Sequence, residues 1–273
     1  MLESIAELFS FAFMQRALVV GLLVSACASL LGVSLVLKRY AMIGDGLSHV
    51  GFGALAVATA LGWAPMAVTI PVVVIAAFLL LRLSEAAKMR GDSAIAMIST
   101  GALALGVTVL SLGKGTTSDV SNYLFGSILA MNAGDVWLSV ALAVLVLVLY
   151  MLFYRKIFAE TFDESFARAT GEKVQTYNML LAFLTAVTIV LGMRMMGAML
   201  ISSLIVFPAL SAMRVCKSFR SVTVCTVLIS VVCFLAGLIG SYLLATPTGA
   251  SVVLSNCVAF LGFWVAGRVR EQA

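Results

Sequence analysis

Nine stretches of about 20 predominantly apolar residues constrain this chain more than any other feature, because a helix of that length crosses the hydrocarbon core of a bilayer. Of the 273 residues, 63% are hydrophobic and only 11% are charged, whereas soluble domains are about 25% charged. These values exclude a soluble enzyme, a disordered chain and a nucleic-acid-binding module. We predict an all-α polytopic membrane protein, with spans near residues 16–37, 40–61, 65–83, 93–113, 134–154, 174–192, 197–213, 219–244 and 249–267.

The distribution of basic residues predicts the orientation of these spans. In a nine-span arrangement, 14 of the 17 Lys and Arg fall on one side, and only Arg16, Lys114 and Arg194 fall on the other. Positive charge is retained in the cytoplasm, so we expect the N-terminus outside and the C-terminus inside. An eight-span arrangement inverts part of this pattern. The loops are short, so residues 1–273 are predicted to form a single transmembrane domain.

Two connections are longer than the others. Residues 114–133 are expected outside, with a short re-entrant or surface helix near 119–131. Residues 155–173 are expected inside and contain four acidic and four basic residues. Asp163 is suited to cap a helix of about two turns that Gly171 ends. This segment is either a solvated loop or a docking helix for a cytoplasmic partner.

Several kinds of chemistry are absent from the sequence. His49 is the only histidine, no Gly-x-Ser-x-Gly motif occurs, and the run from Gly113 to Thr116 does not match a phosphate-binding loop. The chain is therefore predicted not to be an enzyme and not to hydrolyse ATP by itself. The five cysteines are scattered and form no Cys-x-x-Cys pair, so we interpret them as packing residues rather than disulfides or metal ligands.

The second span contains the one constellation that indicates chemistry. Asp45 and His49 are four residues apart, so they share a helix face, with Ser48 beside them. Ionisable residues inside a span are costly and mark functional sites by default. Carboxylate and imidazole suit zinc, manganese or iron, although a structural hydrogen-bonded pair and a proton relay remain alternatives. Two ligands do not complete a metal site, but a two-fold dimer brings four together. The surrounding glycines (Gly44, Gly46, Gly51 and Gly53) permit close packing or leave room for a pathway.

Two further features have a functional and a structural interpretation. Methionines cluster at 193, 195, 196 and 199, where a thioether path would favour copper(I), but flexible gap-filling is the simpler reading. Pro208 is expected to kink the seventh span and free a carbonyl, either as a tolerated bend or as part of a moving gate.

Taken together, several motifs resemble the metal-type permeases of ATP-binding-cassette (ABC) importers, the zinc, manganese and iron uptake group. The most informative is Gly-Asp-x-x-Ser-His at 44–49. The likeness continues in order through GDSAIAMISTGALALGV (91–107), YLFGSIL (123–129), FDESFARATGEKV (162–174), GAMLISSLIVFPALSA (197–212) and GSYLLATPTGASVVL (240–254). The family often has Leu-Pro-Gly shortly after the histidine, whereas Phe52 and Gly53 follow here, so the expected proline kink is missing.

The resemblance implies a fold similar to that of cobalamin and siderophore importer permeases. It implies two permease subunits, as a homodimer or with a related chain, around a two-fold pathway, with a cytoplasmic ABC ATPase dimer below and an extracytoplasmic metal-binding protein outside. By the same resemblance, Asp45 and His49 contact the metal. The coupling positions are Asp163, Glu164, Ala167 and Gly171, and the outer-gate positions are Tyr123, Phe125 and Gly126.

These observations lead to one expected function. We expect an ABC importer permease of the bacterial plasma (inner) membrane that takes up zinc, manganese or iron by ATP-driven alternating access. No permanently bound cofactor and no nucleic-acid partner are expected. The alternatives are a secondary ion-coupled transporter, a membrane scaffold, and an ABC permease for a metal chelate. A secondary transporter would usually carry more buried ionisable groups than one pair.

Overall fold

Each predicted apolar stretch forms a helix in the computed structural model, which describes residues 12–86, 91–112, 126 and 133–272. The helix ends differ from the predicted spans by a few residues. The long helices are α2 (Ala12–Leu37), α3 (Ala41–Ala60), α4 (Pro65–Ala86), α5 (Gly91–Leu112), α7 (Ala133–Leu152), α10 (Val174–Met196), α11 (Ala198–Val215), α12 (Phe219–Leu244) and α13 (Thr248–Gln272). The all-α polytopic class is thereby confirmed.

Among the described residues, eight helices are long and apolar enough to cross a membrane. The remaining predicted span, 134–154, corresponds to α7. It qualifies together with α8 (Tyr154–Phe162), from which it is bent by 66°, so the number of crossings is eight or up to nine. The count of about nine therefore depends on α7, whose apolar part is followed by a helix that turns sharply away.

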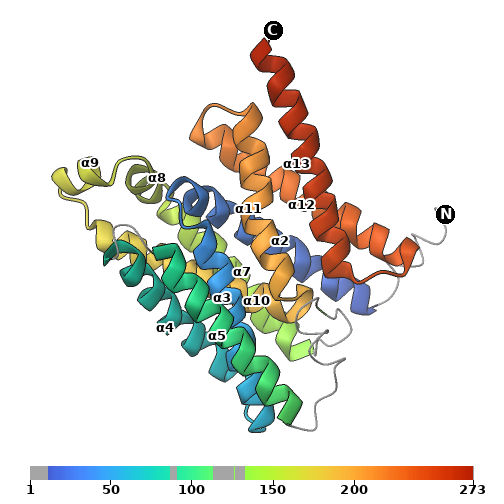
Figure 1. Ribbon diagram of the computed structural model, residues 1–273. Helices are drawn as coiled ribbons and strands as arrows, with labels where there is room; N and C mark the ends of the chain where they lie inside the picture. The colour runs from blue at the N-terminus through green and yellow to red at the C-terminus, as the bar shows by residue number, and fades with distance from the viewer. Residues whose placement is uncertain (1–11, 87–90, 113–125, 127–132, 273) are drawn as a thin grey trace.

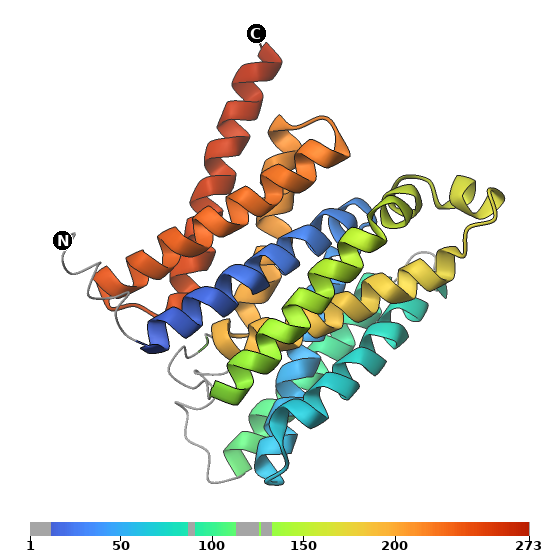
Figure 2. The same ribbon diagram turned by 180° about the vertical axis from the view of Figure 1, so that it is seen from behind.

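Helices α2 and α3 organise the bundle. Helix α2 packs against α11, α12, α10 and α7, while α3 packs against α4 and α5 and also against α10 and α11. Figures 1 and 2 show α3, α4 and α5 grouped on one flank and α12 and α13 on the other. The largest buried apolar cluster runs through α2, α7, α10 and α11. Burial there comes from helix-to-helix packing, because the outer faces of a membrane bundle lose little by meeting lipid.

Two glycines set the closest helix approaches. A Cβ atom added at Gly53 would lie 2.7 Å from the carbonyl oxygen of Ala102, and one added at Gly32 would lie 2.0 Å from that of Ile205. These backbones can approach only because glycine has no side chain at the crossing. The first crossing fixes α3 against α5, and the second fixes α2 against α11.

The connections between helices separate into two ends of the bundle. Segments 38–40, 153–173 and 216–218 gather at one end with the C-terminus of α13, and segments 61–64 and 245–247 lie toward the other (Figure 1). This separation matches the predicted alternation of the spans. Which end faces the cytoplasm stays a prediction based on the basic residues.

The cysteines agree with their predicted role. All five are free thiols, and Cys27 and Cys233 are buried between helices. The Cys27 thiol lies 3.4 Å from the carbonyl oxygen of Ala143 on α7. They act as small packing residues in the bundle.

Candidate functional site

The Asp45–His49 pair lies on one face of α3. Helix α3 continues unbroken from Ala41 to Ala60, through Phe52 and Gly53, so the absence of the proline leaves it without a break. His49 Nε2 lies 3.7 Å from Asp45 Oδ2, and the two side chains are 16% and 45% exposed. The spacing of four residues therefore does bring the carboxylate and the imidazole together.

The distance between these two groups suits a shared ion better than a direct hydrogen bond. At 3.7 Å the Nε2–Oδ2 separation exceeds hydrogen-bond range. The two atoms are placed so that one divalent transition-metal ion would be within reach of both, with a carboxylate oxygen and an imidazole nitrogen as ligands. The His49 Nδ1 atom is buried and has no hydrogen-bond partner among the described residues. Nε2 is the ring nitrogen that faces the Asp45 carboxylate.

Helix α11 contributes a serine that the sequence analysis did not single out. Ser202 Oγ donates a hydrogen bond of 3.2 Å to Asp45 Oδ1 and lies 3.4 Å from Ser48 Oγ. Ser48 itself donates to the carbonyl oxygen of Gly44 at 2.9 Å. Ser202 thus orients the carboxylate, while Ser48 is mainly bound to its own helix. The sequence does not indicate whether Ser202 or Ser203 faces α3, because this depends on how α3 and α11 are rotated relative to each other.

A single chain supplies an incomplete ligand set. No group of three or more His, Cys, Asp or Glu side chains suited to a metal occurs in the part of the chain that the structure describes. The pair also lies on a partly open face, where Met42 on α3 and Met199 on α11 are 46% and 50% exposed. The geometry therefore fits a site that a second surface completes.

The glycines around the pair serve close packing. An added Cβ at Gly46 would lie 2.7 Å from Ile95 of α5, and one at Gly51 would lie 3.0 Å from Met193 of α10. Of the two structural interpretations of these glycines, the observed one is a slim helix held tightly between its neighbours. Their packing leaves the face with Asp45 and His49 as the open one.

The methionine cluster and Pro208 each had a functional and a structural interpretation, and Met193, Met196 and Pro208 lie in well-packed parts of the bundle. Met193 and Met196 are 2% and 3% exposed and belong to the packed core, which agrees with gap-filling. Pro208 is buried inside α11, which remains one helix from Ala198 to Val215. The Ser211 hydroxyl donates to the carbonyl oxygen of Phe207 at 2.8 Å next to the proline. A gating role for Pro208 stays a prediction.

Residues 154–171 form two helices where the sequence predicted one. Helix α9 (Glu164–Ala169) follows α8 directly, and the Asp163 carboxylate accepts a hydrogen bond of 2.8 Å from the Phe166 amide, so the predicted cap is confirmed. Gly171, with φ of +86°, follows the end of α9 as expected. Helix α8 was not anticipated, because its mixed polar and aromatic residues resemble a loop until Ile157 and Glu160 are seen to be buried.

The α8–α9 segment (residues 154–171) presents both charge and aromatic surface. Glu164 pairs with Arg168 at 2.9 Å, and Lys156 pairs with Glu172, whose hydrogen bond raises the pKa of the Lys156 ammonium. Phe162 and Phe166 are 59% and 65% exposed, whereas Ala167 is buried. Exposed aromatic side chains on a short capped helix are typical of a protein contact. This surface belongs to the end of the bundle where the basic connections gather.

The predicted outer-gate residues are largely outside the described part of the chain. Tyr123, Phe125 and most of segment 119–131 are not described. Gly126 is described, with φ of +83°, and an added Cβ there would lie 2.3 Å from the carbonyl carbon of Met196. Gly126 therefore packs against the junction of α10 and α11, opposite in the bundle to the α8–α9 segment.

A multi-helix membrane bundle with a carboxylate–imidazole pair inside one span is typical of a membrane transport protein. Comparison with known sequences makes this specific. Residues 10–266 match the model of the ABC 3 transport family, and the chain belongs to that family. It is a multi-pass protein of the bacterial membrane.

Curated relatives and a solved structure agree with this assignment. The chain is 29% identical over 269 residues to the "Manganese import system permease protein ScaB" of Streptococcus gordonii, covering 98% of this chain and 96% of that protein. It is 30% identical over 252 residues to the "High-affinity zinc uptake system membrane protein ZnuB" of Haemophilus influenzae, covering 92% and 95%. Among solved structures, a chain of PsaBC from Streptococcus pneumoniae in complex with Fab superposes with a TM-score of 0.86 at 27% identity, covering 96% and 94%.

Proposed function

We propose that this chain is the permease subunit of an ABC importer that takes up a divalent transition metal, with Asp45 and His49 as transient ligands. Membership of the ABC 3 transport family and relatives named for manganese and zinc import support the class of function. The observation that carries the role of the residues is the 3.7 Å separation of Asp45 Oδ2 and His49 Nε2 on an open face inside a span.

The cargo is zinc, manganese or iron. The relatives named for manganese and for zinc are 29% and 30% identical to this chain, so overall similarity favours neither metal. A carboxylate and an imidazole bind all three ions. Their relative affinities follow the general order of the divalent metals, which does not indicate which metal the cell imports. A chelate cargo would instead need a wide pathway without ligating side chains at this point.

The open face supports a pair of permease subunits. Two copies related by a two-fold axis would bring the same patch together and would offer two carboxylates and two imidazoles to one ion. Release then requires only that movement of the subunits separates the two halves of the site. Weak, divided coordination of this kind suits a transported ion rather than a permanently bound cofactor.

A separate ATPase dimer supplies the energy in this proposal. The sequence contains no phosphate-binding loop. For docking, the α8–α9 segment offers exposed Phe162 at the end of α8 and exposed Phe166 on the short capped helix α9. Most Lys and Arg are expected at this end, and by the positive-inside rule this supports a cytoplasmic location for it. An extracytoplasmic metal-binding protein would deliver the ion at the opposite end.

Reconstitution tests the proposal directly. The permease is purified with its ATPase, placed in liposomes with the binding protein, and given radioactive zinc, manganese or iron in turn. ATP-dependent uptake of one of these metals is expected. Uptake should fall to background in the Asp45→Ala and His49→Ala variants. Thr59→Val, at the far end of the same helix, is the matched control and should transport like the wild type.

Two results would reject the proposal. Uptake driven by a proton gradient without ATP would favour a secondary transporter. Wild-type uptake in both alanine variants, at equal protein levels, would remove Asp45 and His49 from the pathway even if the chain transports metal.

A further inference from the structure

A buried ion pair connects the α8–α9 segment with the turn that leads into α3. Lys38 lies in the connection between α2 and α3, and its ammonium group pairs with Glu160 of α8. The same ammonium group donates a hydrogen bond to the Asn178 side chain at the start of α10. The side chains of Lys38 and Glu160 are only 7% and 2% exposed. Three separate elements therefore meet at one buried polar cluster, Lys38–Glu160–Asn178.

This pair differs from the other ion pairs of the same region. Lys156 and Glu172 are 43% and 29% exposed, and Arg168 and Glu164 are 71% and 44% exposed. Neither of these pairs includes a residue of the α2–α3 connection. A buried ion pair contributes little net stability, because desolvation offsets the attraction between the charges, so its value more often lies in fixing one arrangement. The Lys38–Glu160 pair is the one that fixes α8 relative to the start of α3.

The α2–α3 connection is short and tightly held. Arg39 has φ of +61°, and the amide of Tyr40 donates to the carbonyl oxygen of Leu35 at 2.7 Å. The Lys38 ammonium lies 5.9 Å from the centre of the Tyr40 ring. Helix α3 begins at the next residue, and Asp45 follows Lys38 by only seven positions. Displacement of Lys38 therefore reaches Asp45 through less than two turns of rigid helix.

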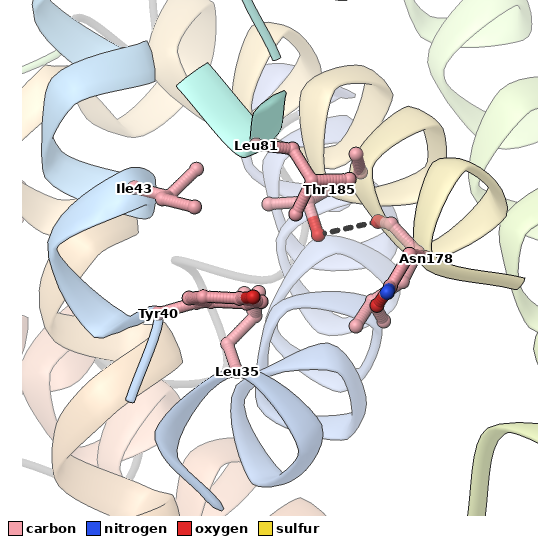
Figure 3. Close-up of a pocket in the computed structure, with 8 residues that line it drawn as sticks. Leu35, Tyr40, Ile43, Leu81, Asn178 and Thr185 are labelled. Atoms are coloured by element: carbon pink, nitrogen blue, oxygen red, sulfur yellow. Dashed lines mark hydrogen bonds between the residues drawn. The ribbon is translucent and has the colours of Figure 1, made fainter. Parts of the chain in front are cut away.

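The first turn of α3 borders a small cavity. Figure 3 shows Tyr40 and Ile43 on one side of it and Asn178 and Thr185 of α10 on the other. Its volume of about 10 Å³ has room for about one water molecule. Thr185 donates its hydroxyl to the carbonyl oxygen of Leu181 at 2.7 Å, so α10 is internally satisfied there. The start of α3 thus meets α10 across a small void.

We infer that Lys38 and Glu160 are positioning residues that transmit movement of the α8–α9 segment to α3 and so to the Asp45–His49 pair. Helix α8 packs against α2, α7 and α10, and the ion pair gives it a polar connection to the residue that precedes the α3 turn. When a bound ATPase displaces α8, the attached ammonium draws the connection with it and reorients the metal ligands. This inference rests on the proposed function.

The test measures metal uptake per ATP hydrolysed. The complex of permease, ATPase and binding protein is reconstituted with Lys38→Met, Glu160→Gln, or both Lys38→Met and Glu160→Leu. The double variant replaces the buried charges with apolar side chains of similar size, a change that buried pairs tolerate without unfolding. We expect the ATPase to remain bound and to hydrolyse ATP within twofold of the wild-type rate, while metal taken up per ATP falls at least tenfold.

Two further variants test whether the Lys38–Glu160 pair transmits movement of α8 or only supports the local structure. The charge swap Lys38→Glu with Glu160→Lys restores the connection and should recover part of the uptake per ATP. The matched control, Ser230→Ala, removes a buried hydrogen bond from α12 to the Ser25 carbonyl oxygen of α2, outside the α8–α9 segment and α3, and should leave the ratio within twofold of the wild type.

The outcomes distinguish this inference from the proposed function. An unchanged ratio in the apolar double variant overturns it, and so does loss of ATPase binding in parallel with uptake, which would mean that the pair only supports the docking surface. If the wild-type complex moves none of the three metals, the proposed function fails instead.

Discussion

Two polar regions of this molecule, the α8–α9 segment and the Asp45–His49 pair of α3, differ in how their charged groups are bound. Around the α8–α9 segment the four acidic side chains all have a partner within the chain: Asp163 caps α9, Glu164 pairs with Arg168, Glu172 pairs with Lys156, and Glu160 pairs with Lys38. In α3 the carboxylate and imidazole lie 3.7 Å apart, and the buried His49 Nδ1 has no hydrogen-bond partner in the described part of the chain. In the first region each carboxylate is bound to a partner, whereas in the second the carboxylate and the imidazole are close together without a hydrogen bond between them.

This difference separates docking from ligand binding. A surface that must hold a partner benefits from a fixed shape, which internal ion pairs and a capped helix supply. A site that must hold and release an ion benefits from donors that are close together but not consumed by each other. The ionisable side chains inside a span remain available because the neighbouring groups satisfy them only in part.

The largest expected effect tests whether Asp45 and His49 act on one ion. We expect Asp45→Asn and His49→Gln each to lower ATP-driven metal uptake by at least about 100-fold. Loss of a group that only hydrogen-bonds to a metal ligand costs up to about 100-fold, and loss of a ligand itself should cost at least as much. The double variant should be no worse than either single one, because either change already breaks the shared site. If a double-mutant cycle of uptake rates instead gave additive losses, Asp45 and His49 would act independently and not on one ion.

The next prediction asks whether the metal region depends on its close packing. Gly53→Val places side-chain carbon against the carbonyl oxygen of Ala102 and should destabilise the protein by about 1–3 kcal/mol. The measurement is thermal unfolding in detergent. Gly101→Ala, in a helix position with no atom near its missing Cβ, is the control and should not lower the unfolding temperature. Equal stability of both variants would contradict the packing argument.

A smaller effect is expected from the cap of α9. Asp163→Ala removes the acceptor for the Phe166 amide and should cost about 1 kcal/mol of local helix stability. ATPase affinity measured by titration in detergent should weaken by about fivefold, while Asp163→Ser, which keeps a cap, should retain it. Unchanged affinity in Asp163→Ala would mean that α9 does not dock the ATPase.

The smallest effect is expected from the exposed pair on α9. Arg168→Gln removes an ion pair with 71% and 44% exposed side chains, and such pairs contribute only about 0.3–0.5 kcal/mol. ATPase binding at moderate salt should change by less than about threefold. A larger loss would show that Arg168 contacts the ATPase directly. This would contradict the interpretation that Arg168 is satisfied within the chain by Glu164.

Much of the fold was predictable because the bilayer imposes a simple rule. Each apolar run of about 20 residues was expected to form a helix, since a helix satisfies its backbone within one segment in lipid, and the predicted spans match the observed ones within a few residues. Helix α8 was missed because aromatic residues such as Phe158 and Phe162 alternate with charges, and only packing against Phe219 shows it to be a helix lying on the bundle.

The candidate site was predictable in part. An Asp and a His four residues apart on a helix must share a face, so the Asp45–His49 pair followed from the spacing. Ser202 and the Lys38–Glu160–Asn178 cluster did not follow, because each of their hydrogen bonds joins residues more than 120 positions apart that come together only when the helices pack.

The sequence by itself thus determined the membrane class, the helices, the Asp45–His49 pair and the cap at Asp163, because each depends on neighbours within one or two helical turns. The tertiary structure decided which face of α3 stays open, which serine orients the carboxylate and which charge is buried between α2, α8 and α10. Those outcomes depend on the rotation and crossing of helices, which glycine contacts such as Gly53 against Ala102 fix only in the packed bundle.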